Sequence, residues 1–282
     1  MRDAWTPTTA VPHNGDVPYL ESNGIRLSYQ RTGHGEDVLL IMGQNAAGHV
    51  WDMHQTPALR GAGYRTTTFN NRGVPPSSAP SGSYTLDEMV ADTRGLIEAL
   101  DLGPCRIIGT SLGALIAEEL AIHSPSLVRS AVLIASRPRS DTLRMAQDRA
   151  DRELHEQGIR LPPRYQAVDT ARKMLSPATL RDDAIASSWL EIFELAAETG
   201  DADGQSGVDF TADRRAALTK IGAPCRVIAF TDDGVVPPHL AAETAEAIPD
   251  CDFVEITNCG HLGYLERPDE VNAAIIEFLD QH

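Results

Sequence analysis

The sequence Cys-Arg-Ile-Ile-Gly-Thr-Ser-Leu-Gly-Ala-Leu-Ile-Ala-Glu-Glu-Leu-Ala-Ile-His-Ser occupies residues 105–124 and joins an apolar run, a G-x-S-x-G pattern and a helical stretch. The run Cys105–Ile108 predicts a strand, and Leu112–Ser124 predicts a helix. A serine on a sharp turn between them needs neighbours without bulk, which the two glycines of the pattern provide. The sequence therefore predicts an enzyme with Ser111 as its nucleophile.

A serine hydroxyl is a poor nucleophile until a base takes its proton and an acid orients that base. Both residue types follow downstream. Asp232 and Asp233 come after the apolar run Cys225–Phe230, and His261 comes after the strand-like run Cys251–Ile256. The chain order is therefore serine, aspartate, histidine.

This order and the G-x-S-x-G turn resemble the α/β-hydrolase superfamily, whose acid and base lie on loops after late strands of one sheet. The resemblance extends from about Tyr19 to Leu279 and includes the loop 232–237 and the start of the last helix at 265–268. In the family the acid stands four residues before a proline, as Asp233 does here. We therefore favour Asp233 as the acid, with Asp232 as the alternative.

The strand pattern predicts the architecture. Asn23-Gly24 separates two extended runs and predicts a hairpin, so the sheet should start antiparallel. Six later apolar runs alternate with helical patterns: Val38–Met42, Arg65–Phe69, Arg106–Ile108, Ala131–Ile134, Arg226–Phe230 and Phe253–Ile256. We expect an α/β fold, the α/β-hydrolase fold, with an eight-stranded, mostly parallel sheet and helices on both faces.

Helical patterns replace the strand pattern between residues 137 and 218. We expect this segment to be a helical cap inserted after the sixth strand, with residues 1–136 and 219–282 forming the core domain. A stripe at helical spacing should pack against the sheet domain or a partner helix: Ile185, Trp189, Ile192, Phe193 and Ala196. Within it, Trp189 and Phe193 are candidate substrate-binding residues. The stretch Thr199–Asp209 predicts a mobile loop.

Acyl transfer creates an oxyanion, which needs two preorganised hydrogen-bond donors. The resemblance assigns these to the main-chain N–H groups of Leu112, after the nucleophile, and Gln44, after the third strand. The latter loop reads Met42-Gly43-Gln44-Asn45, whereas the family commonly has His-Gly there. The side-chain amide of Gln44 or Asn45 either contacts substrate or only completes a turn.

A second loop also departs from the family pattern. Asn71-Arg72-Gly73 resembles part of the family's D-x-R-G-x-G-x-S loop, with Asn70 in place of the acid. The resemblance implies a structural role. We expect Arg72 to bind main-chain carbonyls of neighbouring loops rather than substrate.

The composition of the chain limits the classes of partner and cofactor that it is expected to bind. The formal net charge of −16 repels phosphate backbones and anionic lipid, so no nucleic-acid or membrane partner is expected. No metal-ligand spacing such as H-E-x-x-H occurs, and we expect neither a metal nor another cofactor. The N-terminus lacks an apolar signal region, and no apolar stretch reaches about 18 residues, so a cytoplasmic protein is expected. The sequence leaves open whether the protein forms homo-oligomers.

The leading hypothesis is hydrolysis of an ester, thioester or lactone of a mainly apolar small molecule through an acyl-serine. A cap favours an enclosed pocket, and the acidic surface disfavours polyanionic ligands. Relatives with the same triad also carry out C–C bond hydrolysis and cofactor-free haloperoxidase or perhydrolase chemistry, which form a second hypothesis. A third is a non-catalytic binder of a small ligand with a vestigial triad. The intact set Ser111, Asp233 and His261 argues against it.

Lysines are rare, since only Lys173 and Lys220 occur among 24 basic residues. This bias suggests a GC-rich genome. In such genomes, capped hydrolases often serve specialised metabolism, an association that identifies no substrate.

Overall fold

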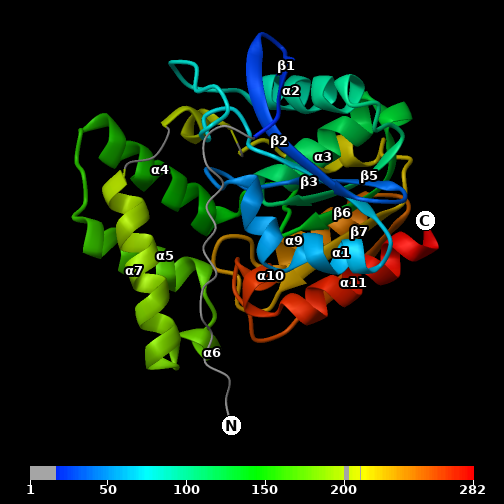
Figure 1. Cartoon of the computed structure of the whole chain (residues 1–282). Coiled ribbons are helices and arrows are strands. Elements are labelled where there is room, and N and C mark those ends of the chain that lie inside the picture. Colours follow the sequence, from blue (N-terminus) through cyan, green and yellow to red (C-terminus); the bar gives the residue numbers. More distant parts are fainter. Residues whose placement is uncertain (1–16, 200–202, 210) are drawn as a thin grey trace.

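The computed structural model describes residues 17–199, 203–209 and 211–282 and is built around one sheet (Figure 1). Its strands are β1 (Tyr19–Ser22), β2 (Ile25–Gly33), β3 (Asp37–Ile41), β4 (Arg65–Phe69), β5 (Cys105–Thr110), β6 (Val128–Ile134), β7 (Cys225–Phe230) and β8 (Cys251–Ile256). They lie in the order β1-β2-β4-β3-β5-β6-β7-β8. Only the pairings of β2 with β1 and with β4 are antiparallel. The predicted eight-stranded, mostly parallel sheet is confirmed.

The hairpin between β1 and β2 turns at Asn23 and Gly24, with φ angles of 49° and 76°. A two-residue hairpin with both angles positive matches the twist of its strands, and asparagine and glycine tolerate this conformation best. The predicted turn is therefore confirmed.

Helices cover both faces of the sheet. They are α1 (Gln55–Gly61), α2 (Leu86–Ala99), α3 (Leu112–His123), α9 (Pro238–Ala247), α10 (Gly263–Glu266) and α11 (Pro268–Gln281). Every residue of β5 and β7 is buried, which requires cover on both sides because successive strand side chains point to opposite faces. Among the described residues, no helix is long and apolar enough to cross a bilayer.

The described part of the chain between β6 and β7 contains helices joined by loops, and no strand. It forms α4 (Thr142–Glu156), α5 (Pro163–Met174), α6 (Pro177–Leu180), α7 (Asp183–Thr199), the 3-10 helix η3 (Asp203–Gly207) and α8 (Arg215–Leu218). Figure 1 shows α4 to α7 as a group to one side of the sheet. The two ends of the insertion meet, because the Arg214 N–H donates to the Pro138 carbonyl at 2.7 Å. Arg214 also binds Glu119 of α3, at 2.6 Å.

The apolar stripe on α7 is only partly buried, so the prediction of a packed stripe is wrong for three of its members. Ile185 and Ile192 are 47% and 54% exposed, and Ala196 is exposed. Trp189 and Phe193 are half-buried, with stacked rings whose centroids lie 5.4 Å apart. A helix at the edge of the molecule buries one side only, and α7 packs against α5, so the other side of its stripe faces solvent.

The predicted mobile loop at 199–209 is also wrong where the structure describes a helix in it. Residues 203–207 form η3, and the side chain of Gln205 within it is fully buried. Residues 200–202 lie outside the described part of the chain.

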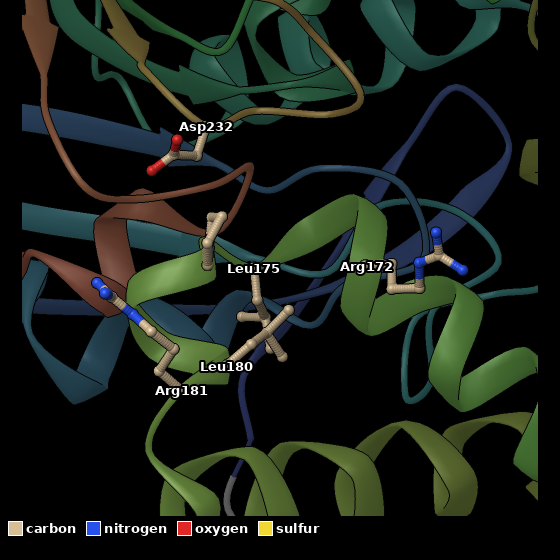
Figure 2. A pocket seen from close by; sticks show the side chains of 6 residues that line it. Arg172, Leu175, Leu180, Arg181 and Asp232 are labelled. Atoms are coloured by element: carbon tan, nitrogen blue, oxygen red, sulfur yellow. The ribbon is translucent and has the colours of Figure 1, made fainter.

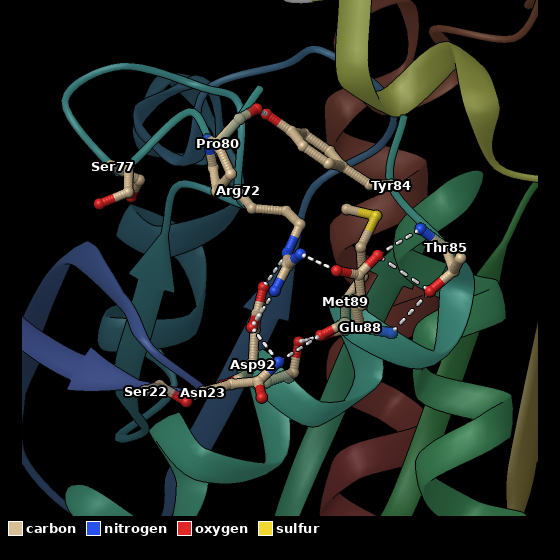
Figure 3. A network of polar contacts seen from close by, with 12 residues as sticks. Ser22, Asn23, Arg72, Ser77, Pro80, Tyr84, Thr85, Glu88, Met89 and Asp92 are labelled. Atoms are coloured by element: carbon tan, nitrogen blue, oxygen red, sulfur yellow. Dashed lines mark hydrogen bonds and ion pairs between the residues drawn. The ribbon is translucent and has the colours of Figure 1, made fainter. Parts of the chain in front are cut away.

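Arg72 lies in a buried network with α2 rather than among main-chain carbonyls (Figure 3). Its guanidinium donates to both carboxylate oxygens of Asp92, at 2.6 and 2.8 Å, and to Glu88 at 2.8 Å. Burial raises the pKa of Asp92, while the bonds from Arg72 and Asn23 oppose that rise. The predicted partners of Arg72 are therefore wrong, because α2 offers carboxylates and a guanidinium forms stronger bonds with charged acceptors.

Candidate active site

Ser111 occupies a strained turn between β5 and α3. Its φ and ψ are 53° and −117°, a region that costs a non-glycine residue free energy and that persists only where the surroundings enforce it. Here the Ser111 N–H donates to the Ile134 carbonyl of β6 at 2.9 Å. Ser111 is only half-buried, whereas every residue of β5 before it is buried.

The two glycines of the pattern allow backbone segments to touch. A Cβ on Gly109 would lie 2.3 Å from the Gly113 carbonyl oxygen, and a Cβ on Gly113 would lie 2.1 Å from that of Ile41. Both distances are far below van der Waals contact with backbone atoms. Only glycine fits at either position, which explains the spacing of the pattern around Ser111.

His261 and Asp233 form a buried pair. The His261 Nδ1 lies 2.8 Å from Asp233 Oδ2. The other carboxylate oxygen of Asp233 accepts the main-chain N–H groups of Val235 and Val236, at 2.8 and 2.7 Å. These bonds hold the carboxylate in one orientation toward the ring. Asp232, by contrast, is exposed.

Topology gathers the three predicted triad residues at one edge of the sheet. Ser111 follows β5, Asp233 follows β7 and His261 follows β8, and all three strands run parallel. The carboxyl ends of parallel strands lie at the same edge, which is where α/β proteins bind ligands. Residues 150 apart in sequence are therefore brought to the same edge of the sheet.

The loop after β3 lies directly against the Ser111 turn. A Cβ on Gly43 would lie 3.4 Å from the Cβ of Ser111. Gln44 is exposed, whereas Asn45 is half-buried and has a positive φ of 56°. Leu112, the other predicted oxyanion donor, begins α3, where main-chain N–H groups have no acceptor within the helix.

Two residues that the sequence analysis missed connect the insertion to this edge. Gln205 accepts the Asn45 N–H at 2.6 Å. Glu266 accepts the N–H and hydroxyl of Ser176, at 3.0 and 2.8 Å, and the N–H of Gly260 at 2.5 Å. The 265–268 motif pointed to Glu266 only as part of the start of the last helix, and no local pattern marks Gln205.

The candidate substrate residues are not brought together at a described cavity. A pocket of about 450 Å³ lies between α5, α6 and the loop after β7 (Figure 2). Its lining consists of Arg172, Leu175, Pro177, Leu180, Arg181 and Asp232. Trp189, Phe193 and Asn45 are not among these residues, so their substrate-binding roles stay predictions. Among the described residues, no cluster of three or more His, Cys, Asp or Glu side chains could hold a metal ion.

Residues 19–274 match the profile described as "Alpha/beta hydrolase family". The chain belongs to this family. It is 41% identical over 256 residues to "Putative non-heme bromoperoxidase BpoC" of Mycobacterium tuberculosis, covering 90% of this chain and 97% of that protein. The crystal structure of that protein from strain H37Rv superposes with a TM-score of 0.86 at 38% identity, covering 95% and 99% of the two chains.

More distant relatives carry hydrolase names. "Putative carbamate hydrolase RutD" of Azorhizobium caulinodans is 26% identical over 265 residues, which are 93% of this chain and 98% of that one. "3-oxoadipate enol-lactonase 2" of Acinetobacter baylyi is 25% identical over 262 residues, which are 91% and 94% of the two chains.

The Gly113 contact leads to a stability prediction. Gly113→Ala should destabilise the protein by about 1–3 kcal/mol or more, because the new methyl group meets the Ile41 carbonyl and the backbone must move. Gly61→Ala in α1 is the matched control, since its Cβ meets open space. Urea unfolding curves measure both variants. Equal unfolding midpoints would show that the turn does not depend on this contact.

Proposed function

We propose that the protein is a serine hydrolase that cleaves an ester, thioester or lactone of a mainly apolar small molecule through an acyl-serine intermediate. The observation that carries this proposal is the 2.8 Å contact between His261 and Asp233 at the sheet edge that also bears the Ser111 turn. A buried histidine held by an acceptor-only carboxylate is oriented for proton transfer rather than for packing.

The pairing defines the role of each ring nitrogen. With its Nδ1–H donated to Asp233, the neutral His261 ring has a free lone pair on Nε2, which accepts the Ser111 proton as the hydroxyl attacks the substrate carbonyl. The tetrahedral intermediate then collapses. His261 returns the proton to the leaving alcohol, thiol or ring oxygen, and water releases the acid from Ser111 by the same steps.

The oxyanion of that intermediate needs donors beside Ser111. We assign them to the main-chain N–H groups of Leu112 and Gln44. Support comes from the position of Leu112 at the start of α3 and from the contact between the Gly43 loop and Ser111. Neither donor depends on side-chain identity, so the absence of the family's common histidine from this loop is compatible with the proposal.

We assign a capping role to the insertion, residues 137–218. The end of α5 touches the loops of both His261 and Asp233. The Leu262 N–H donates to the Met174 carbonyl at 3.1 Å, and a Cβ on Gly234 would lie 3.0 Å from the Lys173 carbonyl. These contacts support a segment that covers the site and limits the size of its substrate.

A second candidate is favoured by the relative at 41% identity, whose name describes a bromoperoxidase. Its chemistry is compatible with the same residues. Hydrogen peroxide would replace water in attack on the acyl-serine, forming a peracid and free serine, and the peracid would then oxidise bromide. The names of the carbamate hydrolase and enol-lactonase relatives support the hydrolytic proposal.

A fluorophosphonate probe tests the nucleophile. Wild-type protein should be labelled covalently at Ser111, and Ser111→Ala should neither be labelled nor turn over p-nitrophenyl acetate, with a loss on the order of 10⁴-fold or more in kcat. The free energy of unfolding of the alanine variant should stay within about 1 kcal/mol of the wild-type value, because the glycines shape the turn. An unlabelled wild type would favour a ligand binder.

Two aspartate variants identify the acid. Asp233→Asn should lower kcat by about 10⁴-fold, because an amide can hold the wrong histidine tautomer. Asp232→Asn is the matched control and should stay within about threefold of wild type, since exposed substitutions away from the reacting groups have small effects. Steady-state kinetics on one ester measure both. A greater loss in Asp232→Asn would overturn the assignment.

A substrate series separates the two reactions and tests the apolar pocket. The series contains p-nitrophenyl esters of rising acyl length, a thioester and a lactone, each assayed with and without hydrogen peroxide and bromide. We expect hydrolysis to prefer neutral acyl groups of medium length. Preference for highly charged acyl groups would contradict the apolar pocket, and bromination exceeding hydrolysis would favour the second candidate.

A further inference from the structure

Gln205 joins two loops of the core from within the insertion. Its side chain is fully buried, and its Oε1 accepts the Asn45 N–H at 2.6 Å. Its Nε2 donates to the Arg72 carbonyl at 2.7 Å. One amide thus pairs with a donor of the loop after β3 and with an acceptor of the loop after β4. Only this orientation of the amide pairs both groups.

The segment that carries Gln205 is seated closely on the core. A Cβ on Gly204 would lie 2.2 Å from the ring of Tyr84, and one on Gly207 would lie 2.4 Å from the side chain of Ser83. The Tyr84 N–H donates to the Gly204 carbonyl at 2.8 Å. Main-chain contact on both sides of Gln205 therefore fixes where its amide points.

The Arg72 end of the bridge is equally constrained. The Arg72 guanidinium lies 5.4 Å from the Tyr84 ring centroid and binds Asp92 and Glu88 of α2 (Figure 3). Its carbonyl is thus part of a rigid support. The Gln205 amide connects the Arg72 carbonyl to the main-chain N–H of Asn45.

Asn45 is a point at which a hydrogen bond can restrain the loop after β3. Its φ of 56° lies in the left-handed region, which asparagine tolerates better than most non-glycine residues. The loop closes through a longer bond of 3.3 Å from the Ala46 N–H to the Gly43 carbonyl. The Asn45 N–H belongs to the peptide that follows Gln44, so holding it restricts the rotation that aims the Gln44 N–H.

We infer that Gln205 is a positioning residue that holds the loop 43–46 in the conformation that points the Gln44 N–H at the reacting oxyanion. The inference rests on the proposed serine hydrolysis, since only that chemistry creates the oxyanion. Gln205 touches no reacting atom. Its effect should therefore fall on the transition state more than on substrate binding.

Three variants test this role on p-nitrophenyl acetate. Gln205→Met keeps the length and removes both hydrogen bonds, and kcat should fall about 10²-fold with KM changed less than about threefold. Gln205→Glu keeps an acceptor for Asn45 and should lose less than about tenfold. Gln157→Met is the matched control, because this exposed glutamine bonds to nearby Glu153 of its own helix, and it should retain wild-type kinetics.

The rate of fluorophosphonate labelling at Ser111 provides a second readout and should fall in the same order, Met below Glu below wild type. Labelling of wild type tests the serine mechanism separately. If wild type is labelled, a folded Gln205→Met with unchanged kcat and labelling rate overturns the inference and leaves the proposed function intact. Should Gln205→Met fail to fold, Gln205→Glu decides, and a raised KM with unchanged kcat overturns the inference.

Discussion

The contact between Gly113 and the Ile41 carbonyl is the constraint on which the site depends. It brings the first turn of α3 against the end of β3, where a Cβ would lie 2.1 Å from the carbonyl oxygen. That proximity forces Ser111 out of the regular strand conformation and puts the loop after β3 beside it. The strain is offset by the hydrogen bond to Ile134 and by the many backbone contacts of a fully buried strand.

The insertion is connected by hydrogen bonds to loops at the edge of the sheet. The Glu266 carboxylate of the core binds both Ser176 of the insertion and the Gly260 N–H next to His261. The Gln205 amide of the insertion binds the Asn45 N–H of the loop that follows β3. Two of the loops that bear predicted chemistry thus have part of their hydrogen bonding supplied by the insertion. A displacement of α5 would break the bond from the Leu262 N–H to the Met174 carbonyl, and a displacement of η3 would break the bond from the Asn45 N–H to Gln205.

Features with local causes could be predicted from the sequence. The hairpin at Asn23-Gly24 and the start of the last helix at Pro268 each depend on a few neighbouring residues, and the structure has both. The number of strands and their mostly parallel pairing follow from alternating strand and helix patterns combined with the family resemblance. The pairing of His261 with Asp233 agrees with the expected order of residues, although their catalytic roles rest on the proposal above.

Features that depend on distant partners could not be predicted. Gln205 lies 160 residues from Asn45, and its surroundings of glycine, serine and aspartate have the composition of a loop. The sequence predicted that Arg72 connects loops by hydrogen bonds. Whether its guanidinium binds carbonyls or carboxylates depends on where α2 lies in the fold. The stripe on α7 was apolar, yet periodicity cannot tell a buried face from one left at the molecular surface.

The hydrogen bond from the Arg214 N–H to the Pro138 carbonyl holds the two ends of the insertion close together. Since the chain leaves and re-enters the core at touching points, the pairing of β6 with β7 is the same whatever length of chain lies between them. The insertion could therefore be replaced by another segment during evolution without a change in the pairing of the strands. A replacement segment would need only to restore the hydrogen bonds that the insertion makes with the core loops, such as those of Gln205 and Met174.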